Sequence, residues 1–135
     1  MPPSVVEFLD RANPAVLGSV RPDGTPHACA AWYRWHEGRA LLTFDRARKR
    51  LEFIRRNPAV SLAVLGRDDW LRHVTLFGNI YEILDDVDLR YADELSHWYL
   101  GRPYPDRSQP RVYAWLQVER WFEWDAYARV GGLYR

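Results

Sequence analysis

A cluster of basic side chains lies at the predicted start of a helix and could bind an anion. The basic residues of this cluster are Arg46, Arg48, Lys49 and Arg50. The sequence predicts a helix over 46–56 with Asp45 as its N-cap. A helix N-terminus carries partial positive charge, so cations there are unfavourable unless an anion docks at the free amides. The cluster therefore indicates an anion site, most simply for phosphate; the alternative is a set of solvated arginines on an exposed face.

Small side chains precede an aromatic pair in the neighbouring strand. The segment from His27 to Trp32 reads His-Ala-Cys-Ala-Ala-Trp, which leaves room for a flat ligand against the backbone. Trp32, Tyr33 and Phe44 could pack on the rings of such a ligand. Thr43 precedes the basic cluster and adds a hydroxyl donor. Together these residues predict a site for a planar ring system that carries a phosphate.

Other residues capable of chemistry have simpler interpretations. Cys29 is the only cysteine, and we expect it to be a small buried side chain rather than a nucleophile. His27 shares a strand face with Cys29, but a metal site there would lack its remaining ligands, so no metal is expected. Tyr99 and Tyr104 lie on either side of Gly101, where a helix should stop, and either tyrosine could contact a substrate.

The elements that position these residues follow from the hydrophobic pattern. The predicted helices are 4–12, 46–56 and 86–99, and the predicted strands are 15–20, 26–35, 40–44, 59–65, 70–84 and 112–124. Short turns between strands and few crossover helices favour an antiparallel arrangement. The expected fold is therefore mostly β within the α+β class: a six-stranded antiparallel barrel with flanking helices.

Two strands carry features beyond simple alternation. The predicted strand 70–84 is apolar on both faces, so either a second subunit or a flanking helix should cover its outer face. Gly78 inside it predicts a β-bulge or a close approach of two backbones. In the last strand, Val112, Leu116 and Phe122 are expected to point to the same side.

Length and composition limit the class of protein. The 135 residues predict a single domain over 1–135, and 47% apolar with 27% charged residues is ordinary for a globular chain. The net charge of +1 argues against nucleic acid as a partner. No apolar run approaches the roughly 20 residues of a membrane-spanning helix, and the N-terminus lacks a signal-peptide pattern. A cytoplasmic location without a membrane partner is expected, which the single cysteine also fits.

The order and spacing of several segments resemble the pyridoxamine 5'-phosphate oxidase-like split-barrel superfamily, whose members bind flavins. The segments that carry the resemblance are 22–27, 32–33, 42–43, 48–49, 57–62 and 72–78. The resemblance covers nearly the whole chain and implies a split β-barrel. It also implies a homodimer with two cofactors at the interface, in which the second subunit covers the strand 70–84.

The resemblance further implies which residues bind the cofactor. Arg48 and Lys49 match the pair that binds the cofactor phosphate, and Thr43 matches the residue that assists. The remaining matched lining positions are His27, Ala28, Cys29, Ala30, Trp32, Leu42 and Ala47. His73 matches a position that reaches the ring from the other subunit and is the catalytic candidate. A histidine there could stabilise a reduced, anionic ring or donate a proton.

Departures from the family pattern indicate which reaction and which branch of the family to expect. The oxidase has basic residues where this chain has His27 and Trp32, and the C-terminal substrate motif of the oxidase is absent. Pyridoxamine phosphate oxidation is therefore not expected. Pro26-His27, Trp32-Tyr33 and the short C-terminus look more like the branch that uses deazaflavin coenzyme F-420, with FMN as the alternative.

The resemblance thus implies an oxidoreductase that passes a hydride between a ring cofactor and a small organic substrate. In such an enzyme the cofactor supplies the chemistry, and the protein supplies orientation and charge compensation. One alternative is an FMN-binding protein of the same fold, either an FMN-dependent oxidoreductase or a carrier without catalysis. The other alternative is a domain that binds single-stranded nucleic acid, and the near-neutral net charge argues against it.

Overall fold

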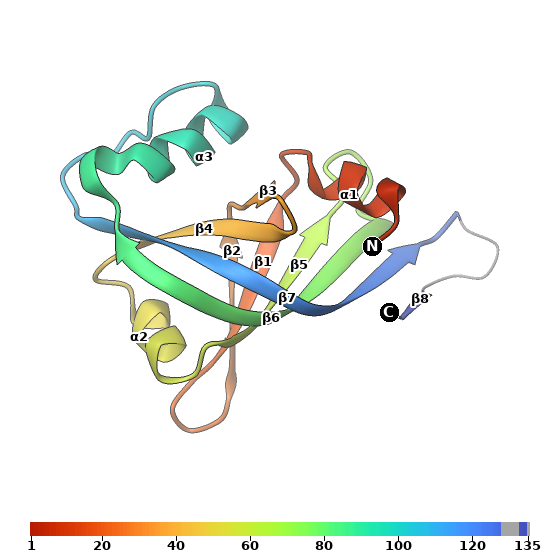
Figure 1. The fold of residues 1–135 in the computed structure, drawn as a ribbon, viewed down its shortest axis with the longest axis horizontal. Helices are drawn as coiled ribbons and strands as arrows, with labels where there is room; N and C mark the ends of the chain where they lie inside the picture. Colours follow the sequence, from red (N-terminus) through yellow and green to blue (C-terminus); the bar gives the residue numbers. More distant parts are fainter. Residues whose placement is uncertain (128–132, 135) are drawn as a thin grey trace.

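A single antiparallel sheet organises the computed structural model, which describes residues 1–127 and 133–134 (Figure 1). The elements in chain order are α1 (Pro3–Leu9), β1 (Ala15–Val20), β2 (Pro26–Ala31), β3 (Arg34–His36), β4 (Arg39–Asp45), α2 (Lys49–Arg56), β5 (Ala59–Leu65), β6 (Arg72–Asp85), the short 3-10 helix η1 (Val87–Leu89), α3 (Arg90–Leu100), β7 (Arg111–Asp125) and β8 (Leu133–Tyr134). Neighbouring strands pair in the order β2-β1-β5-β6-β7-β4-β3, and β8 pairs with β7. The mostly β, antiparallel prediction is confirmed.

The predicted count of six strands was wrong. Within residues 1–127 and 133–134 the sheet contains eight strands, partly because the predicted strand 26–35 divides into β2 and β3. The division falls at Trp32 and Tyr33, where the chain turns the Tyr33 ring into the interior. That side chain is fully buried, and its hydroxyl donates to the Leu9 carbonyl at 2.8 Å. Interior packing of one aromatic residue therefore overrides the strand pattern at this point.

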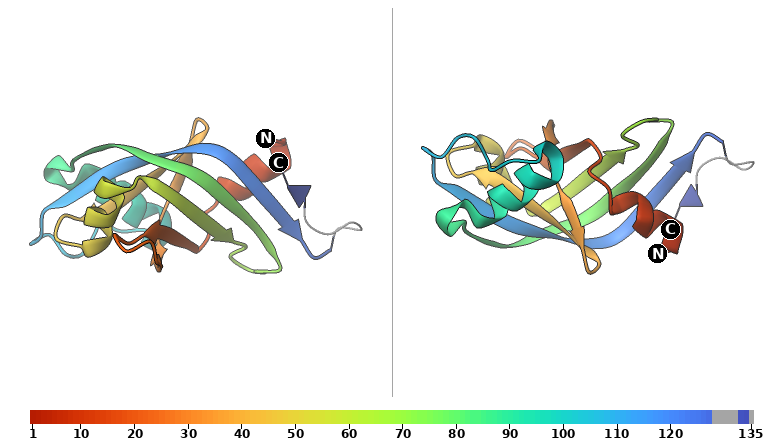
Figure 2. Two further views of the ribbon diagram at one scale, coloured as in Figure 1. Left: turned by 90° about the horizontal axis from the view of Figure 1, so that it is seen from below. Right: turned by 90° about the horizontal axis from the view of Figure 1, so that it is seen from above.

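The sheet curls but does not close into a complete barrel. Figure 2 shows the curvature, which is strongest along the long strands β6 and β7. Among the described strands, no pairing joins β2 to β3, so both remain edges. Among the described residues, no helix is long and apolar enough to cross a membrane.

Two clusters of buried side chains lie on opposite faces of the sheet. The main core gathers Leu42 of β4 with residues of the other strands and of α1 and α2. The smaller cluster joins Leu41 and Trp115 to Leu95 of α3. Because successive side chains of a strand point to opposite faces, the adjacent residues Leu41 and Leu42 belong to different clusters. Helix α3 thus covers the face of β4 and β7 that is turned away from the main core.

Gly78 lies at a close approach between the backbones of β6 and β7. A Cβ atom at this position would lie 1.8 Å from the carbonyl oxygen of Gln117, so only glycine fits without displacing the backbone. The pairing between β6 and β7 also shifts register between Phe77 and Gly78. Both predictions for Gly78, a bulge and a close approach, are therefore confirmed.

The same bulge changes which side chains of β7 point toward the main core. Glu119 is the extra residue of β7, because Gly78 pairs with Val118 while the preceding residue pairs with Arg120. Beyond the bulge, Trp121 packs against the main core. The prediction that Phe122 shares a face with Val112 was therefore wrong.

The second helix begins later than the basic cluster predicts. The Asp45 carboxylate accepts the Ala47 N–H at 3.0 Å in a local turn, and helix α2 begins only at Lys49. Arg48, in extended conformation, is therefore the N-cap, so the predictions of a helix over 46–56 and of Asp45 as N-cap were wrong. Arg46 lies outside the helix and pairs with Asp85.

Candidate anion-binding site

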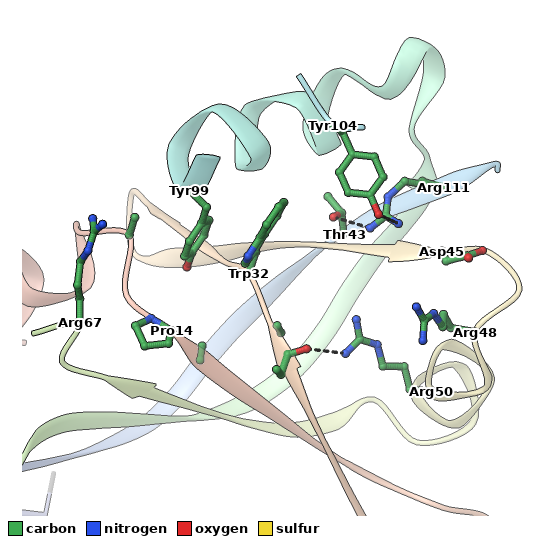
Figure 3. Close-up of a pocket in the computed structure, with 14 residues that line it drawn as sticks. Pro14, Trp32, Thr43, Asp45, Arg48, Arg50, Arg67, Tyr99, Tyr104 and Arg111 are labelled. Atoms are coloured by element: carbon green, nitrogen blue, oxygen red, sulfur yellow. Dashed lines mark hydrogen bonds between the residues drawn. The ribbon is translucent and has the colours of Figure 1, made fainter. Parts of the chain in front are cut away.

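A cavity of about 560 Å³ lies between β4, α3 and the segment that joins β2 to β3 (Figure 3). We call it the arginine cavity, after the guanidinium groups of Arg48, Arg50, Arg67 and Arg111 that line it. The aromatic side chains in its wall are Trp32, Tyr99 and Tyr104. Small residues, among them Ala15, Ala30 and Ala31, line the remainder. The cavity thus combines cationic groups, flat aromatic surfaces and space beside the backbone.

The charge of the cavity lining is strongly unbalanced. Among the described residues that line the cavity, Asp45 is the only carboxylate, against four arginines. One oxygen of that carboxylate already accepts the Ala47 N–H. Because arginine remains protonated in proteins, the lining carries a net positive charge that an anion would compensate.

Arg111 is held at the cavity by two hydrogen bonds. Its guanidinium donates to the Thr43 hydroxyl at 3.1 Å and to the Tyr104 hydroxyl at 3.0 Å. These contacts arise because β4 and β7 pair with Asp45 opposite Arg111. The Nε atom of Arg111 is buried and has no hydrogen-bond partner among the described residues. Thr43 and Arg111 therefore form one fixed polar group on the cavity wall.

Arg50 is the most buried cation of α2. Its guanidinium lies 5.1 Å from the centre of the Phe44 ring, and it donates a long hydrogen bond of 3.4 Å to the Ala30 carbonyl. Burial lowers the pKa of this guanidinium, and the positive charges of Arg48 and Arg111 lower it further. Its Nε atom is also buried without a partner in the described part of the chain. Such an uncompensated cation destabilises the protein unless an anion joins it.

The aromatic wall is a stacked pair that bridges two elements. The rings of Trp32 and Tyr99 are nearly parallel, at 8°, with their centres 5.2 Å apart. The Tyr99 hydroxyl donates to the Asn13 carbonyl at 2.7 Å and accepts the Tyr33 N–H at 3.3 Å. Burial raises the pKa of Tyr99 to about 12, so the hydroxyl stays protonated at neutral pH. The wall is therefore rigid and uncharged.

The loop after α3 is anchored so that Tyr104 stays at the cavity. The Asp93 carboxylate accepts the Tyr104 N–H at 2.9 Å and a hydrogen bond from Arg107 at 2.8 Å. The Arg107 hydrogen bond holds the pKa of Asp93 below its ordinary value. This ion pair thus fixes the backbone from which Tyr104 reaches Arg111.

The structure brings part of the predicted site together. Ala30, Trp32, Thr43 and Arg48 all line the arginine cavity. Lys49 and Ala47 are exposed and are not among its lining residues. The role of these residues in binding a cofactor remains a prediction.

The remaining predicted residues lie outside the arginine cavity of the single chain. His27 contacts the Phe53 ring, with ring centres 5.7 Å apart, and Cys29 is half-buried on the same face of β2. Ala28 is exposed, and Leu42 is buried in the main core because it points away from α3. None of these four residues lines the cavity.

His73 lies on β6, outside the lining of the arginine cavity. Its ring centre is 6.2 Å from that of Phe122, and its Nδ1 atom is buried without a partner among the described residues. The resemblance implies that this position reaches the cofactor of the other subunit, and this role of His73 stays a prediction.

Sequence reasoning did not single out Arg111, Arg67 or Arg50 as site residues. Arg50 belonged to the basic cluster, but its burial distinguishes it from Lys49. Arg111 reaches Thr43 only through the pairing of β4 with β7, for which the local sequence gives no signal. Tyr99 and Tyr104, noted as possible substrate contacts, both line the cavity.

The donor set fits the phosphate of a ring cofactor. Guanidinium groups with buried unpaired nitrogen atoms are suited to a phosphate, and the stacked aromatic pair and small residues are suited to a flat ring. Within the described residues, no group of three or more His, Cys, Asp and Glu side chains is placed to hold a metal ion.

The fold that carries this site is similar to the folds of several solved structures. A protein named F420 reductase aligns with a TM-score of 0.81 and 27% identity, covering 90% of this chain and 98% of that one. A conserved hypothetical protein from Mycobacterium tuberculosis has a TM-score of 0.73 and 25% identity, covering 93% and 85% of the two chains. An FMN-binding protein related to pyridoxamine 5'-phosphate oxidase from Nostoc punctiforme shares the fold, with a TM-score of 0.69, 13% identity and coverage of 99% and 89%.

The sequence itself confirms the relationship. Residues 1–125 match the pyridoxamine 5'-phosphate oxidase family, which is nearly the whole of the described chain. No protein of curated function matches the sequence. The match spans strands β1 to β7, the basic cluster and the described residues that line the arginine cavity. The chain therefore belongs to the pyridoxamine 5'-phosphate oxidase family.

Proposed function

We propose that this protein is an oxidoreductase that binds a flavin-type cofactor in the arginine cavity, with deazaflavin coenzyme F-420 favoured over FMN. The observation that carries the proposal is the pair of half-buried arginines, Arg50 and Arg111, in a cavity with a stacked aromatic wall, where Arg111 also donates to Thr43. The 27% identity to a protein named F420 reductase, over nearly the full length of both chains, supports the choice of deazaflavin.

Each cavity residue has a role in this proposal. Arg48, Arg50 and Arg111 hold the cofactor phosphate, and Thr43 orients Arg111 and offers its own hydroxyl. Trp32 packs against the ring and excludes water from one side. Lys49 stays in the proposal as a phosphate ligand because it starts α2 beside Arg48.

The proposed oxidoreductase works as a homodimer in the cytoplasm. The residues His27, Ala28, Cys29 and Ala47 are retained as cofactor contacts, and the second copy contributes His73. Leu42 is retained only through its backbone, because its side chain is buried in the main core. When bound, a flavin or deazaflavin supplies hydride transfer to or from a small organic substrate. His73 of the second copy would then donate a proton or stabilise negative charge near the reacting ring. No residue of the chain needs to act as a nucleophile.

A titration with both cofactors tests the proposal. Purified protein is titrated with F-420 and with FMN, and binding is followed by cofactor fluorescence. The arginine cavity predicts that Arg50→Met weakens binding by about 10-fold to 100-fold, the loss expected for charge-assisted hydrogen bonds. Arg55→Met is the matched control, because Arg55 is exposed in the last turn of the same helix.

The outcomes separate the candidates. Tight binding of F-420 with weak binding of FMN supports the favoured cofactor. The reverse order supports the FMN alternative, in which turnover with a reductant then separates an enzyme from a carrier. Failure of both cofactors to bind, or equal effects of Arg50→Met and Arg55→Met, rejects the proposed site.

A further inference from the structure

The arginine cavity has a second cationic end that the phosphate group does not need. Figure 3 shows Arg67 beside Pro14, on the far side of Trp32 and Tyr99 from the other arginines. A phosphate held by Arg48, Arg50 and Arg111 leaves the Arg67 guanidinium without an anion beside it. Arg67 is exposed, so water solvates its charge when no ligand is bound, but its position favours a second anionic group at this end.

Arg67 is positioned by a buried residue. Its backbone N–H donates to the Asn13 side-chain oxygen at 3.1 Å, and Asn13 is only 1% exposed. The Asn13 carbonyl also accepts the Tyr99 hydroxyl, so one residue fixes both the aromatic wall and the backbone of Arg67. The neighbouring Gly66 N–H donates to the Arg72 carbonyl at 2.8 Å, which closes the turn between β5 and β6.

The Arg67 side chain has no acidic partner within residues 1–127 and 133–134. Asp69 is two residues away, but its carboxylate accepts hydrogen bonds from the Leu71 N–H and the Tyr127 hydroxyl. The guanidinium is therefore available at the cavity, beside small apolar residues that include Ala12, Pro14 and Ala15.

We propose that the Arg67 end of the arginine cavity binds the acidic group of the substrate, so that the substrate class is a flat organic acid such as an aryl or heteroaryl carboxylate. This inference rests on the proposed function, because it assigns the other end of the cavity to the cofactor phosphate. The Trp32 and Tyr99 pair gives the flat part of the acid an apolar contact, and the Arg67 fork matches a carboxylate in geometry.

The test compares an acid with its neutral counterpart. Binding of 2-naphthoate and of 2-naphthamide is measured by isothermal titration calorimetry with the wild type, Arg67→Met, Arg50→Met and the control Arg55→Met. The wild type should prefer naphthoate by about fivefold, the factor that a solvent-accessible ion pair provides. Arg67→Met should abolish the preference, whereas Arg50→Met and Arg55→Met should retain it.

Equal binding of the two probes by the wild type would overturn the inference. So would a preference that Arg50→Met removes and Arg67→Met leaves intact, because the acid would then occupy the phosphate end. The proposed function fails separately: if the wild type binds neither F-420 nor FMN while the Arg67-dependent preference persists, the acid-binding end stands and the cofactor assignment falls. Unchanged cofactor affinity in Arg67→Met completes the expected pattern.

Discussion

Asn13 ties the cavity to the rest of the fold, and its truncation should destabilise the protein strongly. The Asn13 side-chain amide donates to the Phe8 carbonyl at 2.7 Å, and its oxygen accepts the Arg67 N–H at 3.1 Å. The residue is 1% exposed, so water cannot easily replace the amide. Asn13→Ala would therefore leave the buried Phe8 carbonyl and the part-buried Arg67 N–H without their partner.

The expected loss can be worked from these two groups. Each buried polar group left unpaired costs about 1–3 kcal/mol. Because the Arg67 N–H is only partly buried, its cost lies at the low end, so Asn13→Ala should lower the free energy of unfolding by about 2–4 kcal/mol. The whole free energy of unfolding of a typical domain is only about 5–15 kcal/mol. Urea denaturation followed by tryptophan fluorescence measures the change, read as a shift of the midpoint at constant slope.

A matched substitution controls for the loss of an asparagine side chain. Asn57 also accepts a backbone N–H, from Ala59 at 3.2 Å, but it is exposed. Asn57→Ala should therefore cost less than about 1 kcal/mol, because water takes the place of the side chain. If Asn13→Ala were no more destabilising than Asn57→Ala, the interior role assigned to Asn13 would be refuted.

Three further changes probe the supports of the cavity. Gly78→Ala should destabilise the protein by several kcal/mol, about 2–4, because its Cβ would meet the Gln117 carbonyl; wild-type stability in urea would contradict the backbone approach. Tyr99→Phe removes a part-buried hydroxyl and should cost about 1–2 kcal/mol by the same assay, with cofactor affinity falling less than in Arg50→Met; an unchanged midpoint would count against the bridging role. The pKa of Asp93 is lowered, so its stabilising contribution is present above its ordinary pKa and is lost as pH falls through the lowered value. The stability difference between wild type and Asp93→Asn should therefore shrink as the pH falls below the ordinary aspartate pKa of about 4, and a difference independent of pH would be the contrary result.

Local sequence signals predicted the features that depend on neighbouring residues. Alternating and continuous apolar runs located most strands, Gly78 indicated the bulge, and Gly101 ends α3 with a φ of 73° as predicted. Of the predicted site residues, Ala30, Trp32, Thr43 and Arg48 line one cavity, and their role in binding a cofactor stays a prediction.

Features that depend on contacts between segments far apart in the sequence could not be predicted from local sequence signals. Arg111 meets Thr43 because two strands far apart in the sequence pair in one register. Asn13 acquires its importance from burial, which follows from the packing of α1 and the turn after β5. The late start of α2 results from a competing turn, in which the Asp45 side chain binds the Ala47 N–H before the helix can begin. The residue at which α2 begins is thus decided by this local turn, which an argument from the helix dipole alone does not consider.

The central claim is that the partly buried arginines bind the phosphate of a ring cofactor. Its most direct test compares the affinity of FMN with that of riboflavin, and of F-420 with that of its phosphate-free deazaflavin chromophore, in the wild type and in Arg50→Met. The account predicts that the phosphate improves the affinity of at least one ring by about 10-fold or more in the wild type, and that Arg50→Met removes most of this advantage. Equal affinities with and without the phosphate in the wild type, or an advantage that survives in Arg50→Met, would contradict it.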